Sequence, residues 1–213
     1  MSLILAISTS STQFEVIIGD NSTILFSDSY TLSLTDKRDI SYLVADCLEK
    51  VGRTPQDLTG IVVDIGPGGT SLVRTGVAFG NGLAYSLGVP ICPVLSVELI
   101  GIQAYETHKL PVIVTVKSIK DTAYVALYDG KLVTLKYGIM TEVVAELTAE
   151  IDTFVIAGAH REKVIEVFPN KRIHDSGLLN VNAKLLIEKH DLFKDKYVSF
   201  PFFAHPITEQ STI

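Results

Sequence analysis

The stretch Asp64-Ile65-Gly66-Pro67-Gly68-Gly69-Thr70-Ser71 joins an apolar run, residues 60–65, to a helical pattern, residues 71–87. We expect a buried strand, a glycine-rich loop and a helix in that order. Such a loop lets the backbone approach a ligand closely, and the N–H groups that open the helix can hold an anion. The stretch has neither the Gly-Lys-Ser/Thr of a P-loop nor the GxGxxG of dinucleotide sites. A tight structural turn and an anion or partner site therefore both remain open.

The residues before this loop predict three strands and a helix. Short apolar runs separated by turn residues indicate a meander, with strands at residues 3–7, 14–18 and 24–26. A helix is expected at residues 36–51, with Thr35 or Asp36 as its cap. Its apolar stripe consists of Ile40, Leu43, Val44, Cys47, Leu48 and Val51. With an extended stretch at residues 91–95, the first half reads as three strands, a helix, a strand and a helix.

The second half repeats this order. Strands are expected at residues 112–116, 123–128, 132–137 and 153–156, and helices at residues 141–150 and 183–190. A helix at residues 96–107, capped by Ser96, joins the halves. Two tandem βββαβα units are the layout of the actin, Hsp70 and sugar-kinase superfamily. We therefore predict an α/β fold of two duplicated actin-like (ribonuclease H-like) lobes, residues 1–100 and 101–213; a generic α/β fold with other strands is the alternative.

Composition excludes some classes of function. The net charge is −6 and the isoelectric point about 5.3, which argues against a protein that grips nucleic acid by itself. Cys47 and Cys92 have no CxxC spacing, as expected for reduced thiols in a cytoplasmic protein. The charge-free run of residues 75–97 is long enough for a membrane span, but Pro90 and Pro93 would break such a helix. We expect no membrane contact and no direct nucleic-acid binding.

No catalytic or metal site is evident. The turn Ser8-Thr9-Ser10-Ser11 lies where the superfamily's kinases have a phosphate-contacting hairpin with an acidic residue, and Ser8 takes the place of that residue. Hydroxyl groups alone bind Mg²⁺ poorly. The five histidines form no HxxxH pair, and there is no GxSxG motif. The candidates for anion binding are loop residues: Ser8, Thr9, Ser10, Gly66, Gly68, Gly69 and Thr70.

A row of small residues, Gly76, Gly80 and Ala84, recurs every four positions along the predicted helix of residues 71–87. A glycine inside a helix costs about 1 kcal/mol relative to alanine, so two of them should have a packing reason. A second backbone must come close to this row. It belongs either to this chain's own sheet or helix, or to a partner.

Three segments resemble the TsaB (YeaZ) family. They are the start Ile4-Leu5-Ala6-Ile7-Ser8-Thr9-Ser10, the loop and helix from Gly66-Pro67-Gly68 to Gly82-Leu83-Ala84, and Ala123-Tyr124-Val125-Ala126-Leu127-Tyr128. Members of the family look like ILALDTS, GPGSFTGLRIGLATAKGLA and DARRGEVYVALYD in these places. The chain departs from them at Ser8, at Gly69-Thr70-Ser71 and at the turn of residues 117–122. The departures affect partner contacts rather than the fold.

The resemblance implies a two-lobed actin-like fold and a role in the threonylcarbamoyl-adenosine modification of tRNA. It also implies a catalytically inert scaffold on which TsaD and the ATPase TsaE assemble. In the absence of TsaD, a second copy of this chain is the alternative occupant of the surface that would bind TsaD. No cofactor is expected, although a nucleotide at a shared interface stays open. The alternative is a small ATP-dependent kinase or ATPase of the same superfamily.

The partner surface is predicted on the helices of residues 36–51 and 71–87. The residues expected to bind the partner are Ile40, Leu43, Leu72, Val73, Arg74, Gly76, Val77, Gly80, Leu83 and Ala84.

Overall fold

The computed structural model describes residues 2–31 and 39–211, and the chain forms two compact units. The first unit consists of Met1–Leu95 and Asn182–Pro206, and the second of Ser96–Val181 and Ile207–Ile213. Each unit contains one five-stranded sheet. The two sheets have the same strand order, so the duplication predicted from the sequence is present in the fold.

The sheet of the first unit has the order β3-β2-β1-β4-β5. Its strands are β1 Leu3–Ser8, β2 Gln13–Asp20, β3 Thr23–Thr31, β4 Leu58–Asp64 and β5 Ile91–Val94. β1 lies in the middle, antiparallel to β2 and parallel to β4, and every residue of β1 is buried. Such a strand reads as an unbroken apolar run because both of its faces are covered.

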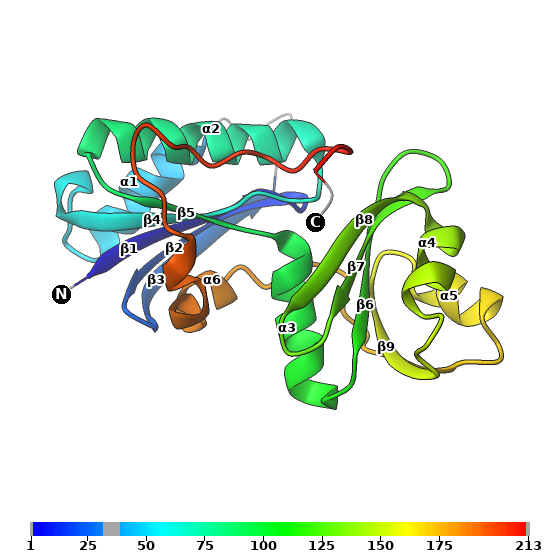
Figure 1. Ribbon diagram of the computed structural model, residues 1–213. Coiled ribbons are helices and arrows are strands. Elements are labelled where there is room, and N and C mark those ends of the chain that lie inside the picture. The colour runs from blue at the N-terminus through cyan, green and yellow to red at the C-terminus, as the bar shows by residue number, and fades with distance from the viewer. Residues whose placement is uncertain (1, 32–38, 212–213) are drawn as a thin grey trace. The chain divides into compact units, whose positions relative to one another are not determined.

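Helices cover both faces of this sheet. The helices α1 Ile40–Lys50 and α2 Thr70–Leu87 lie on one face, and the short α6 Leu185–Glu188 lies on the other (Figure 1). The 3-10 helix η1 Pro55–Asp57 leads into β4. A side-chain carboxylate of Asp39 accepts a hydrogen bond of 2.9 Å from the backbone N–H of Tyr42 and thereby caps α1. The predicted caps Thr35 and Asp36 lie outside the described residues.

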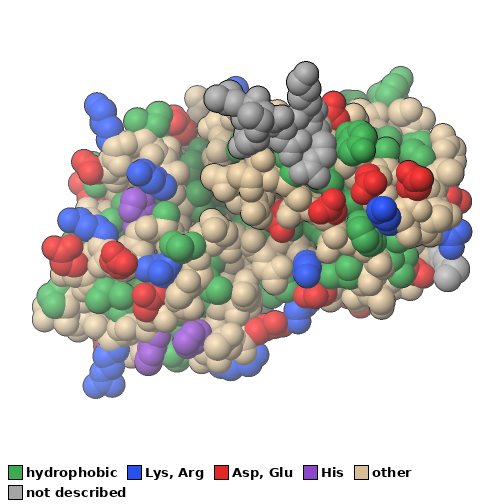
Figure 2. Space-filling model, turned by 180° about the vertical axis from the view of Figure 1, so that it is seen from behind, with side chains coloured by type: hydrophobic (Ala, Val, Ile, Leu, Met, Phe, Trp, Pro, Cys, Tyr) green, Lys and Arg blue, Asp and Glu red, His purple; other side chains and the backbone are tan. Residues whose placement is uncertain are grey.

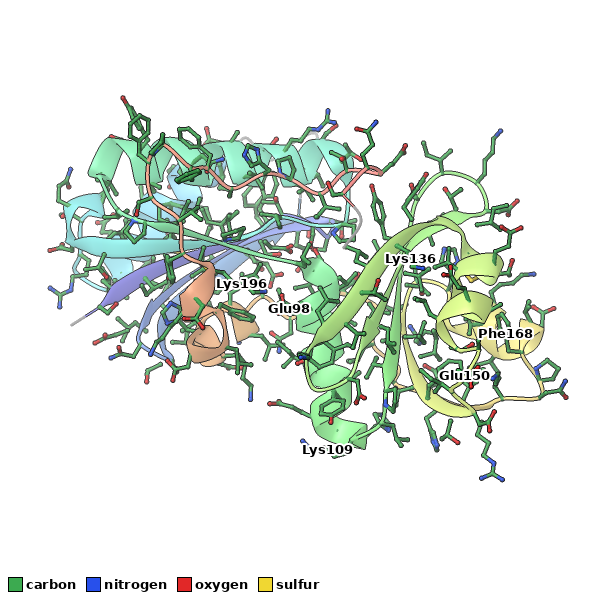
Figure 3. The ribbon with its side chains drawn as sticks, viewed as in Figure 1. Glu98, Lys109, Lys136, Glu150, Phe168 and Lys196 are labelled. Atoms are coloured by element: carbon green, nitrogen blue, oxygen red, sulfur yellow. The ribbon has the colours of Figure 1, made fainter. Side chains whose placement is uncertain are left out.

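The second unit has the order β10-β9-β6-β7-β8. Its elements are β6 Val112–Lys117, β7 Thr122–Tyr128, β8 Leu132–Ile139, α4 Met140–Leu147, β9 Thr153–Gly158, α5 Arg161–Val167 and β10 Arg172–Asp175. The linking helix α3 Ser96–His108 covers one face of the sheet, and α4 and α5 cover the other (Figure 1). Phe154 is fully buried in the core beneath α4 and α5, and Phe168 packs against the same core. Lys136 of β8, which Figure 3 labels, forms an ion pair with Glu146 of α4.

The predicted end of the second lobe needs a correction. The sequence predicted that the last helix of the second lobe would be residues 183–190. In the structure, α5 is the last helix of the second unit. Neither α5 nor β10 was predicted. Val164 is the one buried residue of α5, and β10 is a mostly exposed edge strand, so neither carries a strong apolar pattern.

The segment of residues 182–206 belongs to the first unit, which also corrects the predicted division at residue 100. Leu185, Leu186 and Ile187 are buried there, and Ile187 fills the space above Gly19 of β2. A 3-10 helix, η2 His190–Lys196, follows α6. No helix in the described part of the chain is both long and apolar enough to cross a bilayer.

Candidate functional site

The buried carboxylate of Asp64 organises the loop that follows β4. Its side chain has no exposed surface. One oxygen, Oδ2, accepts hydrogen bonds from the hydroxyls of Ser8 at 2.9 Å and Ser10 at 2.5 Å. The other, Oδ1, accepts a hydrogen bond of 2.9 Å from the backbone N–H of Gly66. A buried charge of this kind is tolerated because donors surround it.

The parallel pairing of β1 and β4 brings two distant candidate segments together. The carboxyl ends of the two strands meet at one edge of the sheet, so residues 8–10 lie against residues 66–69. The N–H of Gly69 donates to the carbonyl of Ser10 at 3.2 Å, and the hydroxyl of Thr9 donates to the carbonyl of Leu72 at 2.8 Å. Any side chain at position 68 would collide with the backbone of Ser10. All predicted loop candidates are therefore gathered in one corner.

Glycine is required at the first position of this loop. Gly66 has φ +88°, a backbone conformation that side chains disfavour, and this bend allows its N–H to turn back to Asp64. Gly69 and Thr70 are exposed at the start of α2. The hydroxyls of Ser8 and Ser10 and the N–H of Gly66 already donate hydrogen bonds within the protein, and their acceptor is the buried carboxylate of Asp64. This arrangement favours a locked turn over an anion site.

The sequence analysis missed Asp64 as a site residue. It treated the corner as uncharged because Ser8 replaces an acidic residue, but Asp64 supplies a carboxylate from the neighbouring strand. A single acidic residue at the end of the apolar run of residues 60–65 was the available signal. The pairing with Ser8 and Ser10 could not be read without the sheet register.

Glu15 places a second carboxylate near this corner. It lies opposite Ser8 in the antiparallel register and is half-buried. Burial and the charge of Asp64 raise the pKa of Glu15, while Lys184 lowers it to a smaller extent. Two carboxylates and two hydroxyls thus gather here. Among the described residues, no group of three or more His, Cys, Asp and Glu side chains is placed to hold a metal ion.

The row of small residues on α2 faces the sheet of its own unit. A Cβ at Gly76 would come within 2.9 Å of Cγ2 of Thr9, and a Cβ at Gly80 would touch Ile91 and Val63 at 3.4 and 3.7 Å. Several further predicted partner residues are buried as well. They are Ile40, Leu43, Val73, Val77 and Ala84. The assignment of these residues to a partner is therefore corrected: they serve internal packing, which brings α2 close to β1 and β4.

The outer face of the two helices carries the remaining predicted residues. Arg74 is exposed, and Leu72 and Leu83 are half-buried. Sequence reasoning missed two exposed features of this face. Tyr42 of α1 is 60% exposed, and Gly82 of α2 has open space where a side chain would be.

A match to a protein-family model shows to which family the chain belongs. The model of the family described as TsaD, tRNA N6-adenosine threonylcarbamoyltransferase, matches residues 36–184, which is more than half of the chain. The chain belongs to the TsaD family.

Solved structures show how far the likeness extends. An uncharacterized protein with similarity to peptidase YEAZ from Pseudomonas aeruginosa is 20% identical, with a TM-score of 0.78 over 99% of this chain and 100% of that one. YeaZ from Pseudomonas aeruginosa is also 20% identical, with a TM-score of 0.77 over 98% and 100%. A ROK family protein from Streptococcus pneumoniae, in complex with sucrose, gives 13% and 0.51 over 89% and 99%. At these identities the likeness concerns the fold.

These findings confirm the family resemblance and the duplicated actin-like fold predicted from the sequence. The TsaD-family match includes the loop at Asp64 and both helices α1 and α2. The YeaZ structures extend the fold likeness to nearly the whole chain, including the segment of residues 182–206.

Proposed function

We propose that the chain is a non-catalytic subunit that supports a TsaD-like enzyme in the threonylcarbamoyl-adenosine modification of tRNA. The observation that carries the proposal is the state of the loop at Asp64. In a nucleotide-handling protein the polar groups of such a corner face the ligand. Here the hydroxyls of Ser8 and Ser10 and the N–H of Gly66 all donate to the protein's own buried carboxylate.

The charge distribution supports a role through protein partners. Acidic and basic side chains are interspersed over the described part of the face shown in Figure 2, and the chain as a whole carries a charge of −6. Affinity for a phosphate backbone depends on concentrated positive charge. We therefore assign tRNA contact to the partner enzyme, with a TsaE-like ATPase as a further partner. The proposed setting is the cytoplasm.

We place the partner surface on the outer face of α1 and α2, around Tyr42, Arg74 and Gly82. Gly82 is the main support for this choice. A glycine inside a helix costs about 1 kcal/mol relative to alanine. Unlike Gly76 and Gly80, Gly82 has no atom of the described residues within 4 Å of the position of a Cβ. The exposed ring of Tyr42 and the guanidinium of Arg74 are side chains of the types enriched at the centres of interfaces.

The test is reconstitution with a TsaD-like and a TsaE-like protein, ATP and unmodified tRNA. Modification should require this chain, and Gly82→Leu should abolish both modification and co-purification without lowering the melting temperature of the isolated chain. Gly82→Ala is the matched control and should retain binding. Modification at full rate without the chain would refute the proposal.

A second measurement, ATP turnover by the isolated chain, distinguishes the proposed function from the alternative activity. A kinase or ATPase of the same superfamily would turn over ATP with Mg²⁺ in the absence of any partner. We expect the purified chain to show no such turnover. Mg²⁺-dependent hydrolysis that disappears in Asp64→Asn would instead support catalysis by this chain.

A further inference from the structure

A pocket of about 570 Å³ lies in the first unit at the N-terminal end of β1. β1 runs from this pocket, at Leu3, to the corner at Asp64, which its last residue Ser8 contacts, so the two sites are at opposite ends of the strand. Pockets that hold small molecules usually enclose about 300 to 1,000 Å³ and combine apolar walls with a few polar groups. The lining residues are Leu3, Asp20, Leu25, Lys50, Val51, Arg53 and Asp57.

Three of the lining residues form an apolar wall. Leu3 is buried at the start of β1, and Val51, the C-cap of α1, is partly buried. Leu25 of the edge strand β3 is 46% exposed. Apolar surface that a ligand removes from water contributes favourably to binding. The pocket can therefore hold the apolar part of a ligand.

The two carboxylates of the pocket already accept hydrogen bonds from the protein. Oδ2 of Asp57 accepts from the backbone N–H and the hydroxyl of Thr54 at 2.8 and 3.0 Å. Oδ1 of Asp20 accepts from the backbone N–H of Ser2 at 3.1 Å and from Nδ2 of Asn21 at 3.2 Å. Donors of this kind stabilise the charged form of a carboxyl group. The negative charges of the pocket are therefore partly compensated without a ligand.

The two cations of the pocket, Lys50 and Arg53, are exposed and have no such partners. In the described part of the chain, neither side chain forms a hydrogen bond or an ion pair. The backbone of Arg53 is nevertheless fixed, because its N–H donates to the carbonyl of Leu48 at 2.9 Å and Gly52 ends α1 with φ +65°. A guanidinium binds a carboxylate through two parallel hydrogen bonds. An anion is thus the missing partner of these side chains.

We propose that this pocket binds a small organic monocarboxylate, whose apolar part lies against Leu25 and Val51 and whose carboxylate pairs with Arg53. Two negative and two positive side chains line the pocket, so a singly charged ligand meets less repulsion from Asp20 and Asp57 than a dianion would. The inference goes beyond the proposed function, which assigns no small ligand to this chain and uses none of these residues.

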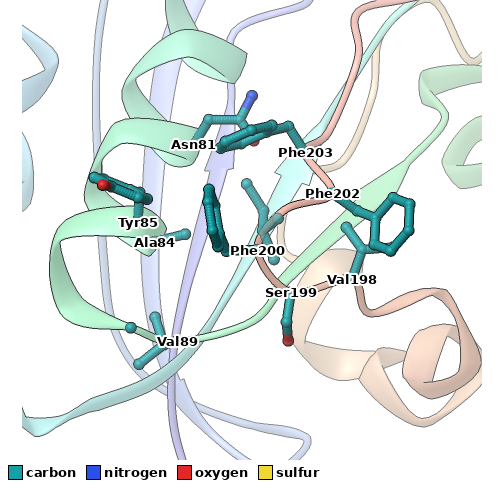
Figure 4. Close-up of a pocket in the computed structure, with 11 residues that line it drawn as sticks. Asn81, Ala84, Tyr85, Val89, Val198, Ser199, Phe200, Phe202 and Phe203 are labelled. Carbon is teal, nitrogen blue, oxygen red and sulfur yellow. The ribbon is translucent and has the colours of Figure 1, made fainter.

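A second hollow, of about 210 Å³, lies beside α2 and provides a contrast (Figure 4). Among the described residues that line it, none carries a charge. An anion that entered it would lose its hydration without compensation. The hollow can accept an apolar group, and its residue Phe202 therefore supplies a control for apolar binding elsewhere on the chain.

The experiment compares hexanoate with hexan-1-ol, which has the same chain without the charge, in ligand-detected NMR titrations of the full chain at neutral pH. Hexanoate should bind about tenfold more tightly, as expected for a hydrogen-bonded charge pair. Arg53→Gln should raise the dissociation constant of hexanoate to that of the alcohol and leave the alcohol unchanged. Equal affinities for the two ligands, or an unchanged constant in Arg53→Gln, would overturn the inference.

Three further variants locate the site, and thermal melts show that each is folded. Leu25→Ser should weaken the binding of both ligands, because it removes part of the apolar wall. Arg172→Gln removes an exposed cation of the second unit and is the matched control for charge; it should leave both constants unchanged. Phe202→Ser should leave hexanoate binding unchanged. Hexanoate binding that is lost in Phe202→Ser and kept in Leu25→Ser would place the ligand in the other hollow and refute the assignment.

Discussion

Alanine at Gly76 and at Gly82 should change the stability of the protein in opposite directions. Both glycines lie inside α2, six residues apart, so alanine gains about 0.8 to 1 kcal/mol of helix propensity at either position. The surroundings differ. Among the described residues, no atom lies within 4 Å of a Cβ at position 82, whereas a Cβ at position 76 comes within 2.9 Å of Cγ2 and 3.2 Å of Cβ of Thr9.

Thr9 cannot move away without loss. It is fully buried and branched at Cβ, and its hydroxyl donates a hydrogen bond to the carbonyl of Leu72. Overpacking costs about 1 to 3 kcal/mol, and a lost hydrogen bond costs roughly 1 kcal/mol more. After subtraction of the gain in propensity, Gly76→Ala should lower the free energy of unfolding by about 1 to 3 kcal/mol. Gly82→Ala should raise it by about 1 kcal/mol.

The assay is thermal and urea denaturation of the two variants beside the unmodified chain. For a chain of this size 1 kcal/mol corresponds to a shift of about 2 to 4 °C in Tm, so the two variants should melt several degrees apart. Equal stabilisation by both substitutions would show that Gly76 does not pack against Thr9, and the assignment of the inner face of α2 would then be wrong.

Three further predictions concern buried polar groups. Ser10→Ala removes a donor from the buried Asp64 carboxylate and should lower the free energy of unfolding by about 1.5 to 3 kcal/mol in urea titrations; an unchanged midpoint would contradict the network. Because the folded-state pKa of Glu15 is raised, its ionisation opposes folding: stability should fall as the pH rises from 4.5 through the raised pKa, and Glu15→Gln should remove that part of the pH dependence in melts at several pH values. Burial raises the pKa of the Cys47 thiol to about 12, and Cys92 is also buried, so a thiol reagent at pH 8 should label neither residue until denaturant is added. Labelling of the native chain at the rate of a free thiol would show that these sites open.

Apolar periodicity was enough to predict most of the fold. The stripe from Ile40 to Leu48 is buried on α1, and the apolar runs of residues 3–7 and 60–65 became the parallel central strands β1 and β4. Burial dictates these patterns, so they are visible in the sequence. β10 and α5 lie at an edge and bury little, and sequence analysis missed them for that reason.

The site was harder to predict because its contacts join distant segments. Asp64 meets Ser8 and Ser10 across more than fifty positions, and that contact depends on which strands pair. The row of Gly76, Gly80 and Ala84 indicated close packing, but the sequence alone could not decide whether that packing was against the chain's own sheet or helix or against a partner. The sequence predicted a helix at residues 183–190 and assigned it to the second lobe, whereas Leu185, Leu186 and Ile187 are buried in the first unit.

The discontinuous first unit affects the order in which a nascent chain can fold. Every strand and helix of the second unit lies between residues 96 and 181 and leaves the ribosome as one uninterrupted stretch. The earlier-synthesised strands β1 to β5 must wait for residues 182–206 before the sheet face under α6 is covered. The usual N-to-C order of domain folding during translation should therefore be reversed here, with the second unit complete before the first.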